Sequence, residues 1–456
     1  MNQEIQLEEW IDGQKFGRFN LNLLAWSFLA MVADGFDIAG LASAAPSLAR
    51  TWHVAPQAFA PALSASLFGI LFGAPLLGHA GDRFGRKTLI VAGCIIFSLG
   101  TLATVWATNL DQVMALRFLT GIGVGGLMPN VIALNSELAP KRLRAMLVVL
   151  AFTGISAGSA LPGAVQAWLI PQHGWQIMFW IGGLAPLIVA VCLLLTLPES
   201  VKFLALQPHR RAELLRILRR LRRDLTIADD AHVAATSANP GADAKIARIY
   251  RGDFAWITPI LWICFATALM ANFFLNSWLP LIFEGSGLTP KQSGIATSLY
   301  HDGGALGGVF VSVLLGRFGF LAVAALFLLA AMAIAAIGAP GLPYLMMASA
   351  AMLAGFCTVG AQYGNNAAAG LLYPTEVRSR AVGWALGIGR FGSIVGPLVG
   401  GMLIARKVPL QQLFVLAAVP MAVGLVASVG IARLTHRRLG GWHLEELRQP
   451  ATQHTD

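Results

Sequence analysis

Long apolar stretches recur along the whole chain, and they constrain its fold more than any other feature. Residues 21–45, 116–134, 180–197 and 321–339 contain few or no charged side chains. Each stretch is close to the roughly 20 residues that a helix needs to cross the core of a bilayer. Only 12% of the 456 residues are charged, which is about half the share found in a soluble globular domain. The sequence therefore predicts a helical membrane protein.

Twelve apolar segments separated by polar loops cover the chain. The predicted spans are 22–45, 60–80, 88–107, 110–133, 145–169, 175–197, 255–281, 291–316, 318–338, 342–371, 378–404 and 410–433. Of the 32 lysines and arginines, 26 fall in segments that this map assigns to the cytoplasm, and only four fall in the outer loops. Cytoplasmic loops carry such an excess. We therefore expect an all-α membrane protein with twelve transmembrane helices in two six-helix halves and cytoplasmic termini.

A polar segment divides the spans into these halves. The expected parts are a cytoplasmic amino-terminal segment (1–21), two bundles (22–197 and 255–433), a cytoplasmic linker (198–254) and a cytoplasmic tail (434–456). In the linker, residues 212–223 place Leu214, Leu215, Leu218 and Leu221 on one helical stripe with arginines around it. This pattern is typical of a helix on an anionic membrane surface. It favours the lipid bilayer as partner over nucleic acid or a calmodulin-like protein.

The two halves resemble weak repeats of one another. Pro140 and Arg144 follow the fourth span, and Pro374 and Arg378 follow the tenth, about half the chain length later. Repeated halves are typical of secondary transporters, which bind their substrate between them. No nucleophile constellation, cofactor motif or metal-ligand spacing is visible. We therefore expect a transporter with no catalytic residue, no cofactor and no metal.

The loop between the second and third spans reads GHAGDRFGRK from Gly78 to Lys87. An acid near a helix end and arginines on a short turn can form charge-assisted bonds across the contact between the halves, and such contacts break in the other access state. This predicts a cytoplasmic gate; simple anchoring of the loop by its basic residues does not explain the acid. The expected members are Asp82, Arg83, Gly85, Arg86, Glu137, Arg144 and Arg378.

Ionisable residues inside the spans are costly, so each is a candidate for function. Asp34 and Asp37 lie three residues apart in the first span, on roughly one helical face. Two anions so close in a low dielectric repel each other, which favours keeping one protonated. This predicts a proton-coupling site, with local structural pairing of either acid as the alternative.

Two arginines are candidates for binding a substrate carboxylate, because a guanidinium offers a planar pair of donors. Arg117 and Asp37 lie at similar depth, which allows them to pair. Arg390 and Asp302 lie midway through their spans, which suggests a second pair. Tyr300 and His301 adjoin Asp302; the histidine is either a proton relay or a packed neutral imidazole.

Amides in the second half complete the expected substrate site. Substrate oxygens could accept hydrogen bonds from Asn272, Asn276, Gln362 and Asn366, and from the hydroxyl of Tyr363 beside them. Alternatively, these side chains serve hydrogen bonding between helices alone. The glycine-rich runs at 121–126 and 303–308 are expected to be close-packing surfaces, because no strand precedes them and no Walker lysine follows them.

Several motifs together resemble the aromatic acid:proton symporter family of the major facilitator superfamily. They are Asp34 to Asp37, Gly78 to Lys87, Arg117 to Gly121, Met128 to Glu137, Pro198 to Ser200 and Tyr373 to Gly392, and the resemblance runs from about residue 20 to 433. It implies import of benzoate-like acids with protons in a bacterial inner membrane. It further implies that Asp34 and Asp37 are needed for uptake, that Asp82 and Arg83 serve the gate, and that Arg390 lies near the substrate carboxylate.

We therefore expect a monomeric carrier that imports an aromatic carboxylate by proton symport through alternating access. A carrier of another organic anion, such as a sugar acid, sialic acid or a dicarboxylate, is the main alternative. A proton-driven drug exporter fits less well, because such exporters tend to use few cavity charges. A sensor of aromatic acids would usually carry an additional signalling domain.

Overall fold

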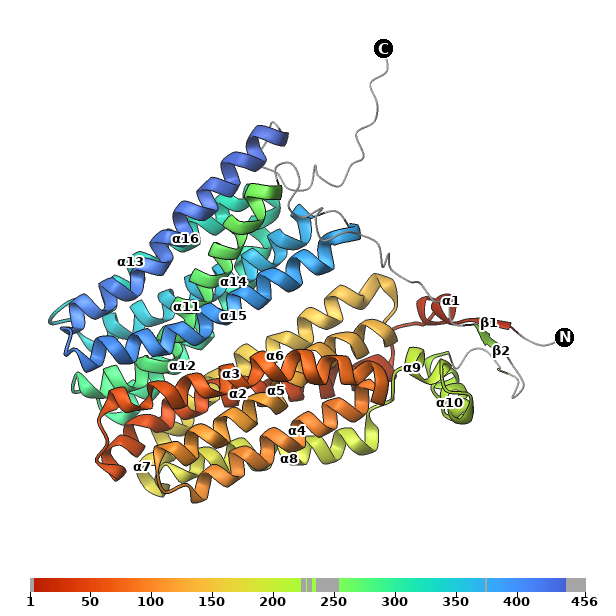
Figure 1. Cartoon of the computed structure of the whole chain (residues 1–456), viewed down its shortest axis with the longest axis horizontal. Coiled ribbons are helices and arrows are strands. Elements are labelled where there is room, and N and C mark those ends of the chain that lie inside the picture. Colours follow the sequence, from red (N-terminus) through yellow and green to blue (C-terminus); the bar gives the residue numbers. More distant parts are fainter. Residues whose placement is uncertain (1–3, 223–226, 228–231, 235–253, 374, 440–456) are drawn as a thin grey trace, which may run out of the picture. The chain divides into compact units, whose positions relative to one another are not determined.

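The computed structural model describes residues 4–222, 227, 232–234, 254–373 and 375–439. In this part of the chain, twelve helices have 18 or more residues (Figure 1). They are α2 (Arg18–Trp52), α3 (Ala60–Phe84), α4 (Arg86–Ala103), α5 (Leu110–Leu138), α6 (Lys141–Trp168), α8 (Gln176–Thr196), α11 (Phe254–Gly285), α12 (Pro290–Phe318), α13 (Phe320–Ile337), α14 (Tyr344–Leu372), α15 (Thr375–Ala405) and α16 (Leu410–Leu439). One long helix corresponds to each predicted span, and most of these helices extend beyond the span at one end or both.

Short elements fill the connections. They are the helices α1 (Leu7–Asp12), α7 (Ile170–His173), α9 (Val201–Ala205) and α10 (Arg211–Leu221), three 3-10 turns (Pro56–Phe59, Thr104–Trp106 and Pro208–Arg210), and the strands β1 (Glu4–Gln6) and β2 (His232–Ala234). The strands pair in parallel, with Glu4 opposite His232. The sequence analysis predicted neither strand, because three residues are too few to show an alternating pattern. The other regular elements of the described residues are helices.

Eleven of the long helices in the described part are both long and apolar enough to cross a membrane. The exception is α12, which has 29 residues but includes Tyr300, His301 and Asp302 near its middle. Polar groups are tolerated at that depth only where they face protein or water. The polar residues near the middle of α12 are therefore expected to face protein or water.

Large apolar side chains are exposed in stripes along the long helices. On α8, Ile188, Val191 and Leu195 are 64%, 53% and 76% exposed, and their spacing puts them on one face. On α16, Val419 and Val423 form a similar stripe. Because a soluble protein rarely exposes continuous apolar surface of this kind, we assign these faces to lipid.

The glycine-rich runs are close-packing surfaces, as predicted. A Cβ added at Gly121 would lie 2.0 Å from the carbonyl oxygen of Ser66 on α3. One added at Gly307 of α12 would lie 1.9 Å from the carbonyl oxygen of Phe356 on α14. Only glycine allows helix backbones to approach this closely, as in other membrane helix pairs.

The chain divides into two compact units. The first comprises Met1–Gly40, Ala65–Ser159 and Gln176–Asn239, and the second comprises Leu41–Ser64, Ala160–Trp175 and Pro240–Asp456. In the first unit α4 packs against both α5 and α8; in the second, α12 packs against α14, α11 against α15, and α13 against α16. The carboxyl-terminal ends of α2 and α6 thus group with helices from the second half of the sequence.

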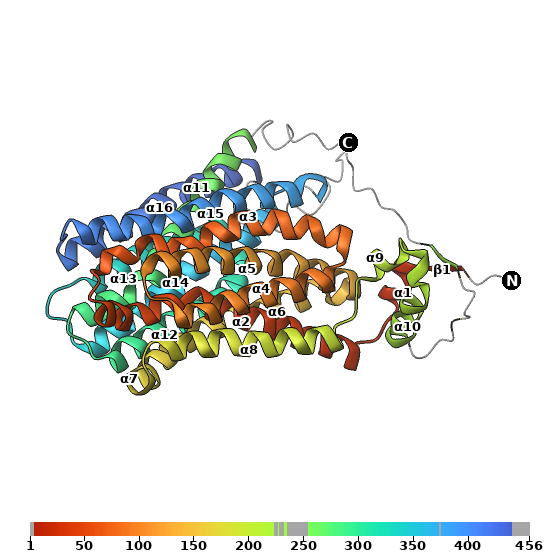
Figure 2. The same cartoon turned by 60° about the horizontal axis from the view of Figure 1, so that its bottom comes forward.

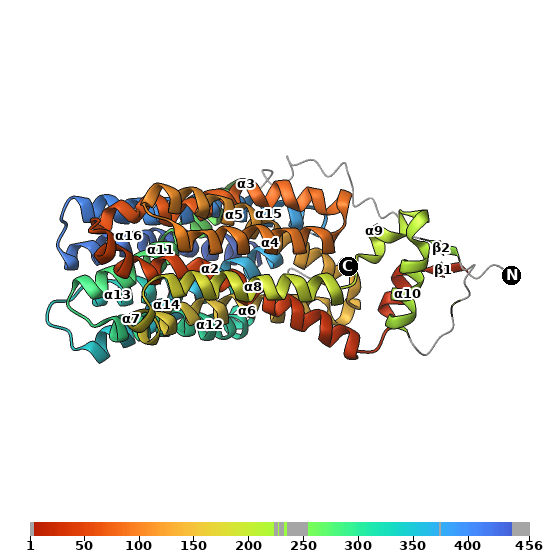
Figure 3. The ribbon, with the colours of Figure 1, turned by 90° about the horizontal axis from the view of Figure 1, so that it is seen from below.

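The amphipathic helix of the linker is covered by protein rather than by lipid. The leucines and the isoleucine of α10, including Leu214 and Leu218, are at most 7% exposed, and Trp10 of α1 donates its indole N–H to the carbonyl of Leu218 at 3.1 Å. Figure 2 shows α1 beside α10, and Figure 3 shows both near the paired strands. The expectation that this stripe lies on the membrane surface is therefore wrong, because the stripe is buried against protein, in contacts that include α9 and Trp10 of α1. The rest of the expected linker and tail, at 223–226, 228–231, 235–253 and 440–456, lies outside the described residues.

Polar bonds also tie α1 to the start of α6. Asp12 accepts a hydrogen bond from the backbone N–H of Lys141 at 2.9 Å and pairs with its ammonium at 3.1 Å. Burial alone raises the pKa of Asp12, but the hydrogen bonds and the charge of Lys141 outweigh it, so that this pKa lies below its ordinary value of 3.8. The amino-terminal segment is therefore held by a charged contact as well as by apolar packing.

Candidate functional site

A buried ion pair joins α2 to α5 in the first unit. Arg117 Nη1 lies 2.7 Å from Asp37 Oδ1, and each side chain is only 2% exposed. The hydroxyl of Thr101 donates to the same Asp37 oxygen at 3.1 Å. Arg117 Nη2 donates to the hydroxyls of Thr101 and Thr120 at 2.9 and 3.3 Å. The pairing expected from the similar depths of Asp37 and Arg117 is confirmed.

The surroundings of this pair make it sensitive to the charge of either partner. Arg117 also lies over the ring of Phe179, with its guanidinium carbon 5.6 Å from the ring centroid. Asp34, one turn before Asp37 on α2, is 1% exposed. Removing one member of a buried ion pair leaves an uncompensated charge in a low dielectric, which is strongly unfavourable. Loss of either charge would therefore destabilise the contact between α2 and α5.

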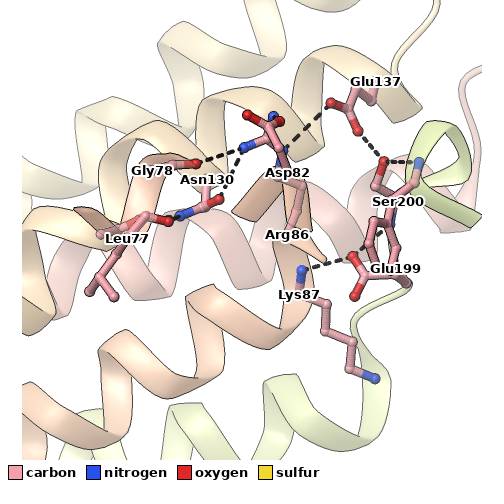
Figure 4. Close-up of polar contacts among 11 residues, drawn as sticks. Leu77, Gly78, Asp82, Arg86, Lys87, Asn130, Glu137, Glu199 and Ser200 are labelled. Carbon is pink, nitrogen blue, oxygen red and sulfur yellow. Dashed lines mark hydrogen bonds and ion pairs between the residues drawn. The ribbon is translucent and has the colours of Figure 1, made fainter. Parts of the chain in front are cut away.

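A second polar cluster lies where α3, α4 and α5 end or begin (Figure 4). Arg86 forms an ion pair with Asp82, and its Nε lies 3.7 Å from Glu137 Oε1. Its Nη1 donates to the carbonyl of Gly78 at 3.2 Å and to Asn130 Oδ1 at 3.3 Å. Arg86 thus connects three helices of the first unit. We expected its partners in the other half of the chain, whereas these partners belong to its own unit.

The segment after α8 completes this cluster. The hydroxyl of Ser200 donates to Glu137, and the backbone N–H groups of Lys87 and Ser200 donate to Glu199 Oε1 at 3.0 and 2.9 Å. Gly85 has φ = +98°, and a Cβ added there would lie 2.3 Å from Glu199 Oε2. The turn therefore requires glycine for its backbone conformation and for the approach of the carboxylate.

The sequence analysis named only part of this cluster. It proposed no role for Asn130, Glu199 or Ser200, although the motifs that contain them contributed to the family resemblance. The position of these three residues within those motifs is the sequence feature that could have indicated a role for them. The contacts themselves could not be read from the sequence, because they join residues more than 40 positions apart.

The other expected gate residues lie apart from these contacts. Arg83 is exposed, with its guanidinium 5.5 Å from the ring centroid of Phe84. Arg144 is half-buried near the start of α6. The side chain of Arg378 lies outside those that the structure describes. Their part in a gate remains a prediction.

Tyr300 anchors a chain of hydrogen bonds in the second unit. Its hydroxyl lies 2.5 Å from Asn272 Oδ1, and Asn272 Nδ2 donates to Gln362 Oε1 at 3.1 Å. Tyr300 and Thr358 are fully buried, with their hydroxyl oxygens 3.3 Å apart. The chain connects α11, α12 and α14, and it brings together three of the residues expected at the substrate site.

The remaining candidates differ in exposure. His301 is 7% exposed, its ring centroid lies 5.1 Å from that of Tyr300, and its Nε2 has no hydrogen-bond partner among the described residues. Asp302 is exposed and Arg390 is half-buried. The ion pair expected between them is not among those formed by the described residues. Equal depth in two spans was insufficient evidence for that pair, because depth does not fix which way a helix face points.

Three other predicted substrate residues lie on α11 and α14. Asn276 is buried at 5% exposure, whereas Tyr363 and Asn366 are half-buried. The ring of Tyr363 packs on Gly308 of α12, since a Cβ added at that glycine would lie 2.4 Å from Tyr363 Cδ2. This contact supports a packing role for Tyr363.

A third polar cluster, which the sequence analysis did not predict, joins the ends of α2, α6 and α11 within the second unit. Glu284 forms an ion pair with Arg50 and accepts a hydrogen bond from Gln166 Nε2 at 2.9 Å. The same nitrogen lies 3.1 Å from the hydroxyl of Ser293. The Glu284 side chain is 8% exposed although Arg50 is 56% exposed. These bonds explain why the ends of α2 and α6 group with this unit.

No group of three or more His, Cys, Asp or Glu side chains able to hold a metal ion occurs in the described ranges. The four cysteines are free thiols. The groups available to bind a ligand are therefore the charged, hydroxyl and amide side chains described above.

Comparisons with known proteins place this chain among transporters. The sequence model described as Major Facilitator Superfamily matches residues 27–319 and 261–448. The 4-hydroxybenzoate transporter of Pseudomonas aeruginosa is 33% identical over 440 residues, which cover 96% of this chain and 98% of that protein. The gallate transporter of Pseudomonas putida is 34% identical over 436 residues, covering 95% and 96%. The fold is similar to that of the xylose transporter of E. coli in a partially occluded inward open conformation, with a TM-score of 0.67, 16% identity, and coverage of 91% and 97%.

Proposed function

The chain belongs to the major facilitator superfamily, as its motifs predicted, and from this premise we propose that it imports an aromatic carboxylate together with protons. It is a multi-pass transporter of the bacterial inner membrane and not an enzyme. The names of its relatives, which include transporters of 4-hydroxybenzoate and gallate, support an aromatic acid as substrate. The residues of this chain must account for import and for its coupling to protons.

The buried pair of Asp37 and Arg117 is the observation that carries the coupling proposal. Both side chains are removed from water, so their interaction depends strongly on the charge of each. Protonation of Asp37 would remove the negative charge and release Arg117 from its partner. Asp34 adds a second carboxyl one turn away, and together the two acids supply the groups that can take up and release protons.

Arg390 is the arginine that we propose for the substrate carboxylate. Arg390 is half-buried on α15, and it lies in one of the motifs that resemble the aromatic acid:proton symporter family. A guanidinium can bind a carboxylate through two parallel hydrogen bonds. Substrate would then be held in the second unit while protons are handled in the first.

The polar clusters around Arg86 and Glu284 are our candidates for the gates of alternating access. Each consists of charged side chains at helix ends with several partners. Interfaces of this kind adopt discrete arrangements rather than deforming continuously. In this proposal the Arg86 cluster, including Glu137, stabilises the inner ends of the first-unit helices, and the Glu284 cluster stabilises the outer ends of α2, α6 and α11.

Uptake by proteoliposomes tests the proposal. Radiolabelled 4-hydroxybenzoate, gallate and benzoate should accumulate when the outside is more acidic than the inside, and a protonophore should abolish accumulation. Asp37→Asn should lose accumulation against a gradient, whereas Asp111→Asn, which removes an exposed acid from the first turn of α5, should behave as the wild type. Full proton-driven accumulation by Asp37→Asn would exclude the coupling mechanism, and no uptake of any aromatic acid by the wild type would exclude the substrate class.

A further inference from the structure

We propose that Gln362 donates hydrogen bonds to an oxygen substituent on the ring of the transported acid, and that Tyr300 and Asn272 hold it in the orientation that does so. This inference rests on the proposed function, because it assigns a part of the substrate site that the carboxylate does not use. The observation behind it is the directed chain of hydrogen bonds that connects α11, α12 and α14.

The direction of the chain follows from counting hydrogens. A tyrosine hydroxyl has one hydrogen to donate, and of the three oxygens near Tyr300 Oη, Asn272 Oδ1 is the closest at 2.5 Å. The backbone oxygen of Asn272 and the hydroxyl of Thr358 are both 3.3 Å away. The Thr358 hydroxyl has its own acceptor, the carbonyl of Ala354 at 2.8 Å. Tyr300 therefore donates to Asn272 Oδ1.

This bond fixes the orientation of two amides in turn. With its oxygen facing Tyr300, Asn272 presents its NH2 group to Gln362 Oε1 at 3.1 Å. Gln362 thus uses its oxygen as an acceptor, and its own NH2 group, with two hydrogens, has no partner among the described residues. Through these hydrogen bonds, the buried hydroxyl of Tyr300 orients Gln362 on α14 so that both N–H groups of its amide are left to donate.

The exposure of the side chains differs along this chain of hydrogen bonds. Tyr300 is fully buried, whereas Asn272 and Gln362 are half-buried. An amide on a membrane-spanning helix is unfavourable against lipid, where no partner exists, so partly exposed amides face protein or a water-filled passage. The NH2 group of Gln362 is therefore available to a solute that enters this unit.

The ligand chemistry follows from the donor character of the site. Two N–H groups suit an oxygen with free lone pairs, such as a phenolic hydroxyl, and they gain nothing from a methyl group of similar size. A site built for a hydrogen bond discriminates against an analogue that lacks the partner more strongly than an apolar pocket discriminates by size. Gln362 should therefore favour hydroxylated aromatic acids over their methylated counterparts.

The test compares KM values for uptake of benzoate and its 2-, 3- and 4-hydroxy and methyl derivatives by the full chain in proteoliposomes. In the wild type, at least one hydroxy acid should have a KM about three- to tenfold lower than its methyl counterpart, as expected for one buried hydrogen bond. Gln362→Met should bring the KM values of the hydroxy acid and its methyl counterpart close to each other. An unchanged hydroxy-to-methyl ratio in Gln362→Met would overturn the inference.

Tyr300→Phe and Asn272→Leu test the positioning role. Each removes one link of the hydrogen-bond chain, so each should bring the ratio of the hydroxy-acid KM to the methyl-acid KM closer to one. Tyr373→Phe is the matched control, because Tyr373 is also buried and its hydroxyl lies 2.8 Å from that of Thr258, outside this chain. An equal shift of this ratio toward one in Tyr373→Phe would show that a buried hydroxyl acts only through general packing, and would refute the assignment of Tyr300. Failure of the wild type to transport any aromatic acid would instead refute the proposed function.

Discussion

Replacing Asp37 by asparagine removes one charge from the pair with Arg117 while preserving the size of the side chain. Each partner is 2% exposed, so the arginine cannot recover its lost partner from water. Removing one member of a buried ion pair destabilises proteins by about 3–5 kcal/mol. The asparagine oxygen can still accept from Arg117, and a neutral hydrogen bond is worth about 1 kcal/mol. We therefore expect Asp37→Asn to lower the free energy of unfolding by about 3 kcal/mol.

Three further variants separate this charge effect from the loss of a contact. Thr101→Val removes one hydroxyl from the same cluster and should cost about 1 kcal/mol. Arg117→Gln should cost about as much as Asp37→Asn, because it leaves the carboxylate without its cation. The double variant Asp37→Asn/Arg117→Gln should be less unstable than the sum of the single variants, since neither charge remains buried alone.

Denaturant titration of the detergent-solubilised protein, followed by far-ultraviolet circular dichroism, measures these differences. The same variants, reconstituted in proteoliposomes, report on accumulation. If Asp37→Asn is no less stable than Thr101→Val, or if the single costs simply add in the double variant, the ion pair does not stabilise the fold as argued.

Three shorter predictions concern other contacts. Gly85→Ala should impair folding and uptake, because φ is +98° there and a Cβ would lie 2.3 Å from Glu199 Oε2; wild-type expression and transport would contradict this account of the turn. Glu284→Gln should weaken the contact with Arg50, so that the outer end of α2 opens more often. A cysteine introduced at that end should then be alkylated faster. Unchanged labelling would argue against a gate. Because the pKa of Asp12 is lowered in the folded state, its contact stabilises the docked amino-terminal segment above pH 3.8 and is lost as the pH falls through the lower folded value. Limited proteolysis of that segment should therefore increase in acid for the wild type, and Asp12→Asn should be equally susceptible across that range.

Much of the fold followed from the sequence, because membrane-spanning helices depend on a local property. Each needs only an apolar run of sufficient length, since the bilayer leaves backbone polar groups no other partner. Twelve long helices therefore lie where twelve runs were found. The pair of Asp37 and Arg117 could be anticipated for a related reason: in this membrane protein, charges at similar depth have few other groups to meet.

Contacts that depend on how helices rotate and pack were decided only by the tertiary structure. Depth suggested a pair of Asp302 with Arg390 as readily as the pair of Asp37 with Arg117, yet only the second is present among the described residues. The apolar stripe of α10 resembled a membrane-binding face, but it is buried against protein, in contacts that include α9 and Trp10 of α1.

The hydrogen bonds from Tyr300 to Gln362 likewise combine residues that the sequence predicts with contacts that only the tertiary structure decides. The sequence indicated which polar residues lie within the helices, because composition is local. Their partners and the direction of their hydrogen bonds depend on side chains from three helices meeting in space, and no local pattern encodes that meeting.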